Sequence, residues 1–287
     1  MKNLLITGAN GQLGSELRVL SSENKEFNYF FTDINELDIL DQAAVDQYIT
    51  ENEIDTVVNC AAYTAVDKAE DNQELCHRLN ALAPGYLAQA VEKRKGSLIQ
   101  ISTDYVFDGT AHIPYKETAQ TCPASTYGRT KLEGEENARK ACEQTTIIRT
   151  AWLYSIYGNN FVKTMLRLGK ERDELGVVAD QIGTPTYARD LARAIYTAIN
   201  RNITPGVYHF SNEGVCSWYD FTKAIHYLAG IKDCHVRPLH TEEYPTAAQR
   251  PHYSVLDKTK IRSTLQIEIP HWFDSLSHCI CLLKNLK

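Results

Sequence analysis

The sequence NLLITGANGQLG, residues 3–14, places three glycines between a short apolar run and a helical pattern. Glycine suits each position for a separate reason. Gly8 permits a tight turn, Gly11 lets the backbone approach a diphosphate, and Gly14 lets a helix pack closely against a strand. Because the loop stands in strand–turn–helix order, it predicts a parallel α/β fold that binds a dinucleotide.

A second signal is Asp33, which ends the next apolar run, YFFTD at 29–33. A carboxylate at this place can accept hydrogen bonds from the adenosine ribose, and its charge repels a 2′-phosphate. An Asp at a strand end is also common in ordinary turns. Together with the glycine loop, it favours dinucleotide binding.

Outward from this stretch, apolar runs alternate with helical patterns. This rhythm predicts a Rossmann-type, doubly wound parallel sheet. The runs are continuously apolar, as expected when helices cover both faces of a sheet. A long helical region before the fourth run contains Pro84, which marks a break or a new first turn. The expected strands are 3–7, 29–33, 55–61, 97–103 and 145–152.

The rhythm loosens after about residue 150, which predicts two parts. We expect residues 1–150 to form the dinucleotide-binding domain, with part of 175–205 packed against it. Residues 151–287 should form mainly a smaller C-terminal lobe that binds the substrate.

Composition excludes several classes of protein. The formal net charge of −6 does not favour a nucleic-acid or anionic-membrane partner. The eight cysteines form no C-x-x-C pair, which indicates a reducing cytoplasm rather than a disulfide framework or a zinc site. His278 beside Cys279 and Cys281 could suggest a metal, but an ordinary helix carrying small thiols explains the pattern, so we expect no metal.

Tyr127 and Lys131 lie four residues apart in STYGRTKLEGEE, residues 125–136, and therefore share a helix face. By themselves they are either surface decoration or a proton-transfer pair. A free phenol has a pKa of about 10. A nearby ammonium favours the phenolate, so we expect Lys131 to lower the pKa of Tyr127. Thr103, at the end of the fourth expected strand, adds a hydroxyl at the edge where such sheets bind ligands.

These motifs resemble the extended short-chain dehydrogenase/reductases. Further blocks are similar, more narrowly, to the dTDP-4-dehydrorhamnose reductases, and the resemblance covers nearly the whole chain. It implies that NADH or NADPH reduces C4 of dTDP-4-dehydro-β-L-rhamnose to give dTDP-β-L-rhamnose, the last step of dTDP-L-rhamnose synthesis. The blocks are DIL (38–40), NCAAYTAVDKAE (59–70), STDYVFDG (102–109), YGRTK (127–131), NNFVKTMLRL (159–168) and DQIGTPT (180–186).

The resemblance also implies roles for single residues. Tyr127 would be the catalytic acid/base, assisted by Lys131 and Thr103. Thr103, Asp104 and Trp152 would contact the sugar, although Trp152 also suits core packing. Arg250 would contact a phosphate or the base, although it also suits a solvated surface. The expected cofactor contacts are Gly8, Asn10, Gly11, Gln12, Leu13, Gly14, Asp33, Asp38, Ile39, Ala62, Tyr63, Thr64, Ile101, Tyr127 and Lys131.

Other activities of similar proteins remain as alternatives. A 4,6-dehydratase is disfavoured because Tyr105 stands where its glutamate base is expected. Another nucleotide-sugar reductase or epimerase stays open, as does a non-catalytic regulatory subunit of the methionine adenosyltransferase type. Some related proteins pair through a metal held by glutamates. Glu16 fits one such position, but Arg189 replaces another, so we expect a monomer or a weak homodimer.

Overall fold

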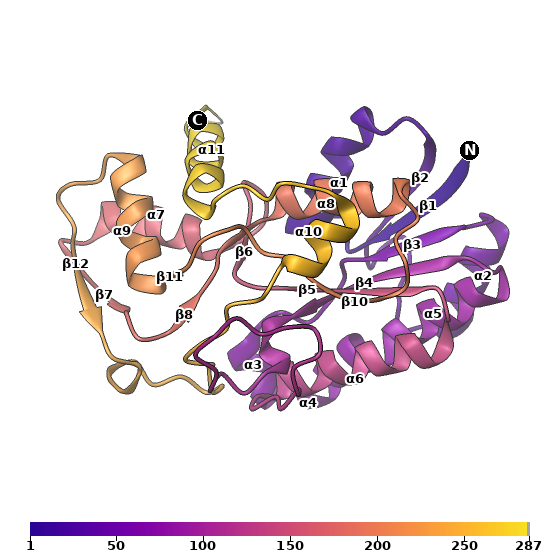
Figure 1. The fold of residues 1–287 in the computed structure, drawn as a ribbon, viewed down its shortest axis with the longest axis horizontal. Coiled ribbons are helices and arrows are strands. Elements are labelled where there is room, and N and C mark those ends of the chain that lie inside the picture. The colour runs from indigo at the N-terminus through magenta and orange to yellow at the C-terminus, as the bar shows by residue number, and fades with distance from the viewer. Residues whose placement is uncertain (286–287) are drawn as a thin grey trace.

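The computed structural model describes residues 1–285, and its centre is a parallel sheet of six strands (Figure 1). The strand order is β10-β5-β4-β3-β1-β2. The chain adds β2 on one side of β1 and then β3, β4 and β5 on the other side, as in doubly wound folds. The predicted fold class is confirmed, and all five expected strands are present. The sheet strands are β1 (Lys2–Thr7), β2 (Phe27–Thr32), β3 (Thr56–Asn59), β4 (Ser97–Thr103), β5 (Thr145–Thr150) and β10 (Gly206–His209).

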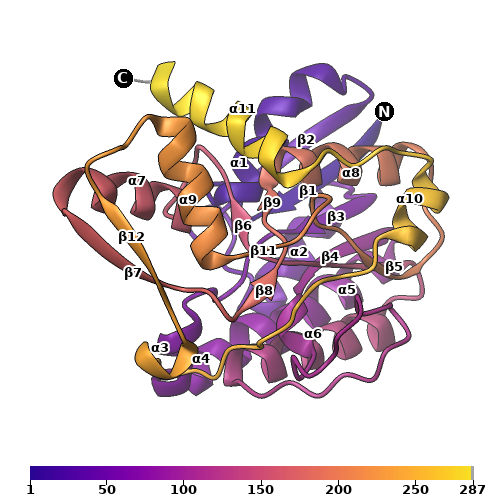
Figure 2. The same ribbon diagram turned by 60° about the vertical axis from the view of Figure 1, so that its left-hand side comes forward.

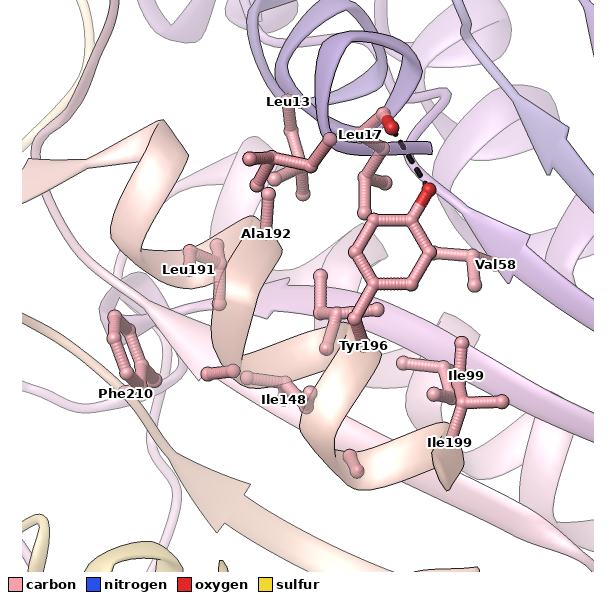
Figure 3. Packing of buried hydrophobic residues seen from close by; sticks show 14 of the residues in the cluster. Leu13, Leu17, Val58, Ile99, Ile148, Leu191, Ala192, Tyr196, Ile199 and Phe210 are labelled. Atoms are coloured by element: carbon pink, nitrogen blue, oxygen red, sulfur yellow. Dashed lines mark hydrogen bonds between the residues drawn. The ribbon is translucent and has the colours of Figure 1, made fainter. Parts of the chain in front are cut away.

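Helices cover both faces of this sheet (Figure 1). One layer holds α1 (Gln12–Leu20), α8 (Ala188–Asn200) and α10 (Thr259–Leu265). The other holds α2 (Gln42–Glu51), α5 (Ala83–Lys93) and α6 (Thr126–Ala141). Figure 3 shows the first layer, where the Tyr196 hydroxyl of α8 donates to the Leu17 carbonyl of α1 at 2.8 Å. This contact joins chain segments that lie far apart in the sequence.

The remaining chain forms a smaller lobe beside the sheet (Figure 2). Its core surrounds Phe221 of α9, a helix that packs on α7, α11 and the parallel pair of β7 and β12. The elements are β6 (Leu153–Tyr154), α7 (Phe161–Glu171), β7 (Glu174–Val178), β8 (Ile182–Gly183), β9 (Thr186–Tyr187), β11 (Cys216–Ser217), α9 (Trp218–Ala229), β12 (His235–Leu239) and α11 (Trp272–Asn285).

The chain beyond residue 150 contributes to both parts. β10 pairs with β5 in parallel and forms the sixth strand of the main sheet, while α10 packs beside β10 and α8. These segments return to the sheet after the smaller lobe has begun. No single boundary in the sequence therefore separates the sheet from the smaller lobe.

The helical region around Pro84 is interrupted without being broken. α3 (Val66–Asp71) and α4 (Gln73–His77) lead into a π-helical turn at Arg78–Leu82, and α5 follows with Pro84 in its first turn. Pro lacks the backbone N–H that a helix interior needs, so the widened turn lies where regular bonding is interrupted. Among residues 1–285, no helix has both the length and the apolar character needed to cross a membrane.

Candidate active site

A buried chain of polar side chains joins the carboxyl ends of β1, β3 and β4. The Thr7 hydroxyl donates to Asn59 Oδ1 at 2.6 Å, and Asn59 Nδ2 donates to Gln100 Oε1 at 2.7 Å. Gln100 Nε2 then donates to the Ile101 carbonyl at 2.8 Å. These bonds pair amides that burial would otherwise leave unsatisfied. They also tie three strands together at the edge where the expected site residues meet.

The glycine loop is shaped to approach an anion. Gly8 adopts a left-handed φ of 62°, and a Cβ on Gly14 would collide with the backbone of Gly8 and Ala9. Helix α1 begins at Gln12, and no side chain of the described residues caps its first turn. Its first amides therefore lack a side-chain acceptor and carry the positive end of the helix dipole, an arrangement that suits a diphosphate.

The side chains after Gly11 are engaged elsewhere in the protein. Leu13 is buried in the core, and Gln12 Oε1 accepts a hydrogen bond from Asn160 Nδ2 at 3.0 Å. The loop would therefore meet a diphosphate with its backbone amides, which explains why glycines rather than charged residues are spaced along it.

Asp33 lies directly against the glycine loop. Its Oδ2 accepts a hydrogen bond from the Asn10 backbone N–H at 3.0 Å, and its Oδ1 accepts one from Ile34 at 2.9 Å. The loop and the end of β2 thus form one continuous surface. Asp38 is exposed, with its Oδ1 accepting from the Leu40 amide, whereas the Ile39 side chain is buried.

Asn80 is a site residue that sequence reasoning missed. It lies in the π-helical turn, and its Oδ1 accepts from the Tyr63 amide at 2.8 Å while its Nδ2 donates to the Tyr63 carbonyl at 3.1 Å. The amide therefore holds the expected cofactor-binding segment of Ala62, Tyr63 and Thr64. A buried Asn within the apolar helical run LNALAP was the available signal.

The structure brings Thr103, Tyr127 and Lys131 together. Thr103 ends β4, while Tyr127 and Lys131 stand on the first turns of α6, which the Ser125 hydroxyl caps by accepting from the Gly128 amide at 3.1 Å. Lys131 Nζ donates to the Ile101 carbonyl at 2.6 Å. The backbone of β4 thus aims the lysine, and Thr103 hydrogen-bonds the Tyr127 phenol.

Burial controls the protonation of this group. It raises the pKa of Tyr127, and the hydrogen bond from Thr103 opposes this rise only in part. The expected lowering of this pKa by Lys131 is not seen in this structure, because burial is the largest influence on the phenol and Lys131 is not among the groups that shift it. The phenol keeps its proton near neutral pH and can donate it. Burial also lowers the pKa of Lys131 to about 8, while Glu135 acts to raise it.

Asp104 adds a buried acid beside Thr103. Its Oδ1 accepts from the Thr103 hydroxyl at 3.0 Å, whereas its Oδ2 is buried without a hydrogen-bond partner among the described residues. Burial raises the pKa of Asp104 to about 6, with the Ser254 and Thr103 hydroxyls opposing the rise. An unpaired buried carboxylate oxygen is costly, so a polar ligand group could satisfy it.

Trp152 and Arg250 have specific partners in the structure. Trp152 has a left-handed φ of 48°, uncommon for a bulky residue, and its ring stacks on Trp218 with centroids 3.5 Å apart. Arg250 donates to both carboxylate oxygens of Asp67, at 2.9 and 2.7 Å. Arg250 also lines a small cavity with Tyr105, whose ring meets Tyr127 edge-on at 5.5 Å.

Glu16 is bonded within the chain. It is fully buried, and its two oxygens accept from the Ser155 hydroxyl at 2.7 Å and from Arg189 Nε at 2.8 Å. The Arg189 guanidinium therefore balances the negative charge of Glu16, which is the role that a bound metal ion would otherwise fill. Within residues 1–285, no cluster of His, Cys, Asp or Glu is suited to hold a metal ion.

Comparison with known proteins agrees with this geometry. The family model described as the RmlD substrate binding domain matches residues 1–285. A dTDP-4-dehydrorhamnose reductase from Aggregatibacter actinomycetemcomitans is 41% identical, covering 97% of this chain and 98% of that protein. Among proteins of known structure, the dTDP-4-dehydrorhamnose reductase of Clostridium acetobutylicum is 46% identical with a TM-score of 0.94, covering 98% of this chain and 99% of that one.

A second solved structure carries a dinucleotide. It is the dTDP-4-dehydrorhamnose reductase of Bacillus anthracis in complex with NADP, 41% identical with a TM-score of 0.93, covering 98% of this chain and all of that one. Similarity of this extent along both chains shows common descent as well as a common fold. The chain belongs to the RmlD family, which includes the dTDP-4-dehydrorhamnose reductases.

Proposed function

We propose that this protein reduces the C4 ketone of dTDP-4-dehydro-β-L-rhamnose to dTDP-β-L-rhamnose, using NADH or NADPH. The observation that carries the proposal is the meeting of Thr103, Tyr127 and Lys131 at the same sheet edge from which the glycine loop leaves β1. The names of the relatives supply the substrate. The uncapped start of α1 and the position of Asp33 fit a dinucleotide.

The residues divide the work of a ketone reduction. When bound, the reduced nicotinamide supplies the hydride. Tyr127 keeps its proton because burial raises its pKa, so it can deliver that proton to the developing alkoxide. The Thr103 hydroxyl donates to Asp104 Oδ1 in this structure and, by turning, can donate a hydrogen bond to the same oxygen. An ammonium has three donors, and Lys131 gives one to the Ile101 carbonyl, leaving two for the nicotinamide ribose.

Dehydration is a poorer fit to these residues. Dehydration needs a base that removes a carbon-bound proton of the sugar, and this base is expected directly after the acid Asp104. Tyr105 follows Asp104, and burial raises the pKa of this phenol, as does the neighbouring Asp104 charge. A neutral phenol cannot act as that base.

The test is an absorbance assay of dinucleotide oxidation with the dTDP-linked 4-keto sugar, with the product identified by mass spectrometry. We expect turnover and a product two hydrogens heavier than the substrate. Dinucleotide binding without turnover would instead indicate a regulatory subunit. Reduction of only a different keto sugar would indicate another nucleotide-sugar reductase.

Cofactor preference gives the first prediction. Asp33 lies against Asn10, where a 2′-phosphate would meet its charge, so we expect NADH to be used at least as well as NADPH. Repulsion between the Asp33 carboxylate and a 2′-phosphate in close contact would cost on the order of 1 kcal/mol, which lowers the affinity for NADPH by a factor of several. Asp33→Asn removes the charge and should shift the ratio of kcat/KM several-fold toward NADPH.

One cation packs on the strand that precedes Asp33. The Arg18 guanidinium of α1 lies 4.7 Å from the centroid of the Phe31 ring, two residues before Asp33. Sequence reasoning missed it because the two elements are separate in the chain. The matched control is Asp233→Asn, an exposed acid of the smaller lobe with the same charge loss, which should leave the ratio unchanged. A wild-type preference for NADPH of tenfold or more would contradict the role of Asp33.

The pH dependence of NADH binding gives the second prediction. The pKa of Lys131 is about 8, so its ammonium is present below that pH and is lost above it. Because the charged form donates to the ribose, NADH affinity should fall as pH rises through about 8. Titration by nicotinamide fluorescence between neutral and alkaline pH measures this midpoint. Lys131→Met should bind NADH more weakly and lose the pH dependence, and a midpoint that persists in this variant would belong to another group.

A further inference from the structure

A buried ion pair stands next to Lys131 and has no role in the mechanism described above. Glu135 lies one helical turn after Lys131 on α6, and both side chains are buried. The Glu135 carboxylate accepts from Arg149 Nε at 2.9 Å, from Arg149 Nη2 at 2.7 Å and from the Ser102 hydroxyl at 2.5 Å. Two strands, β4 and β5, therefore hold one carboxylate in place.

The Glu135 contact is one of a row of contacts between β4 and α6 that also includes the proposed catalytic residues. Three consecutive residues of β4 each bind one residue of α6. The Ile101 carbonyl accepts from Lys131, the Ser102 hydroxyl donates to Glu135, and the Thr103 hydroxyl bonds Tyr127. A shift of α6 along β4 would disturb all three contacts together, so the Glu135 contact helps to align the other two.

We propose that Glu135, held by Arg149 and Ser102, is a positioning residue that keeps the Lys131 ammonium charged and aimed at the cofactor ribose. This inference rests on the proposed function, because it assumes that Lys131 binds the dinucleotide.

The groups around Lys131 show why a carboxylate is needed. Burial acts against its charge. The side chains that face it from other elements are Cys60, after β3, and Cys76, on α4. Burial raises the pKa of both thiols, so neither supplies negative charge near neutral pH. Glu135 is the largest influence that opposes the effect of burial on Lys131.

Arg149 keeps the Glu135 carboxylate from pairing directly with Lys131. It engages both oxygens of Glu135, and no ion pair joins Glu135 to Lys131 in the described part of the chain. Glu135 therefore acts on Lys131 through its field and does not consume the remaining ammonium donors. A buried carboxylate without Arg149 would draw Lys131 away from the Ile101 carbonyl.

The test is the pH dependence of NADH binding in Glu135→Gln. Glutamine keeps the shape and can still accept from Ser102, but it removes the charge. An opposite charge at close range shifts a pKa by roughly 1–3 units, so the midpoint near pH 8 should move about one unit lower. At pH 7.5, NADH should bind several-fold more weakly than to wild type, and at pH 6 nearly equally. An unchanged midpoint in the folded variant overturns the proposal.

The matched control is Glu133→Gln. Glu133 lies on the same helix with the same charge, but its side chain is half-exposed and hydrogen-bonds His77. This variant should keep the wild-type midpoint, and a similar shift would mean that any charge on α6 is sufficient. Glu135→Asp retains a carboxylate and should restore a midpoint close to wild type.

A second variant covers failure of Glu135→Gln to fold. The double substitution Glu135→Gln/Arg149→Met leaves no uncompensated charge, and such replacement of buried pairs is often tolerated. The midpoint should still lie below that of wild type, because Glu135 is the larger influence on Lys131. A wild-type midpoint in this variant also overturns the proposal. If Lys131→Met binds NADH normally, the failure lies in the proposed function and not in the role of Glu135.

Discussion

Tyr127→Phe lowers kcat by roughly 10²- to 10⁴-fold, the usual contribution of a general acid. The phenylalanine ring retains the edge-on contact with Tyr105, whose centroid lies 5.5 Å away, so the pocket keeps its shape. The only group lost is the hydroxyl that bonds Thr103 and carries the proton for the product oxygen. Steady-state turnover with the dTDP-linked keto sugar measures the loss.

NADH binding separates this result from unfolding. The dissociation constant of Tyr127→Phe should stay within a few-fold of wild type, because Lys131 and the glycine loop are untouched. The control is Tyr105→Phe, which removes the half-buried phenol that packs against Tyr127 and should change kcat only slightly. A Tyr127→Phe enzyme that retains more than a tenth of the wild-type rate would show that another group donates the proton.

Arg149→Met destabilises the fold by about 3–5 kcal/mol, because it takes from the buried Glu135 carboxylate the guanidinium that bonds both of its oxygens. The two side chains are only 5% and 4% exposed, so water cannot replace the lost partner. For a chain of this size the melting temperature should fall by roughly 6–15 °C. Thermal unfolding followed by circular dichroism measures the change.

The control for this prediction is an exposed pair of the same chemistry. Arg167 and Glu171 are 59% and 52% exposed and lie one turn apart on α7. Arg167→Met should cost about 0–1 kcal/mol, since water and salt already screen that pair. Equal losses from the two arginine variants would mean that the buried pair contributes no more than a surface one.

The features that could be predicted from sequence are those in which neighbours along the chain make the structure. Gly8, Gly11 and Gly14 act within one turn, and their spacing indicates a tight approach whatever follows. Tyr127 and Lys131 share a face because helical residues four apart always do. The inner strands β3 and β5 are buried along their whole length, which their apolar composition predicts, whereas the edge strand β2 is only partly buried. These local rules were sufficient for the fold class and the five strands that carry the glycine loop and Thr103.

Contacts between distant segments had no such signal. Arg250 meets Asp67, Arg189 meets Glu16 and Arg18 lies over Phe31 only because the folded chain brings separate elements together. β10 joins β5 for the same reason, since pairing of strands depends on which neighbour leaves an open edge.

The amino-acid sequence by itself determined which groups this protein has for chemistry, namely a phenol, an ammonium and a hydroxyl at the end of parallel strands. Only the tertiary structure decided their protonation. Proximity in sequence suggested that Lys131 would lower the pKa of Tyr127, yet burial raises it. The energy of a charge depends on all the atoms that exclude water from it, and those atoms come from every part of the folded chain.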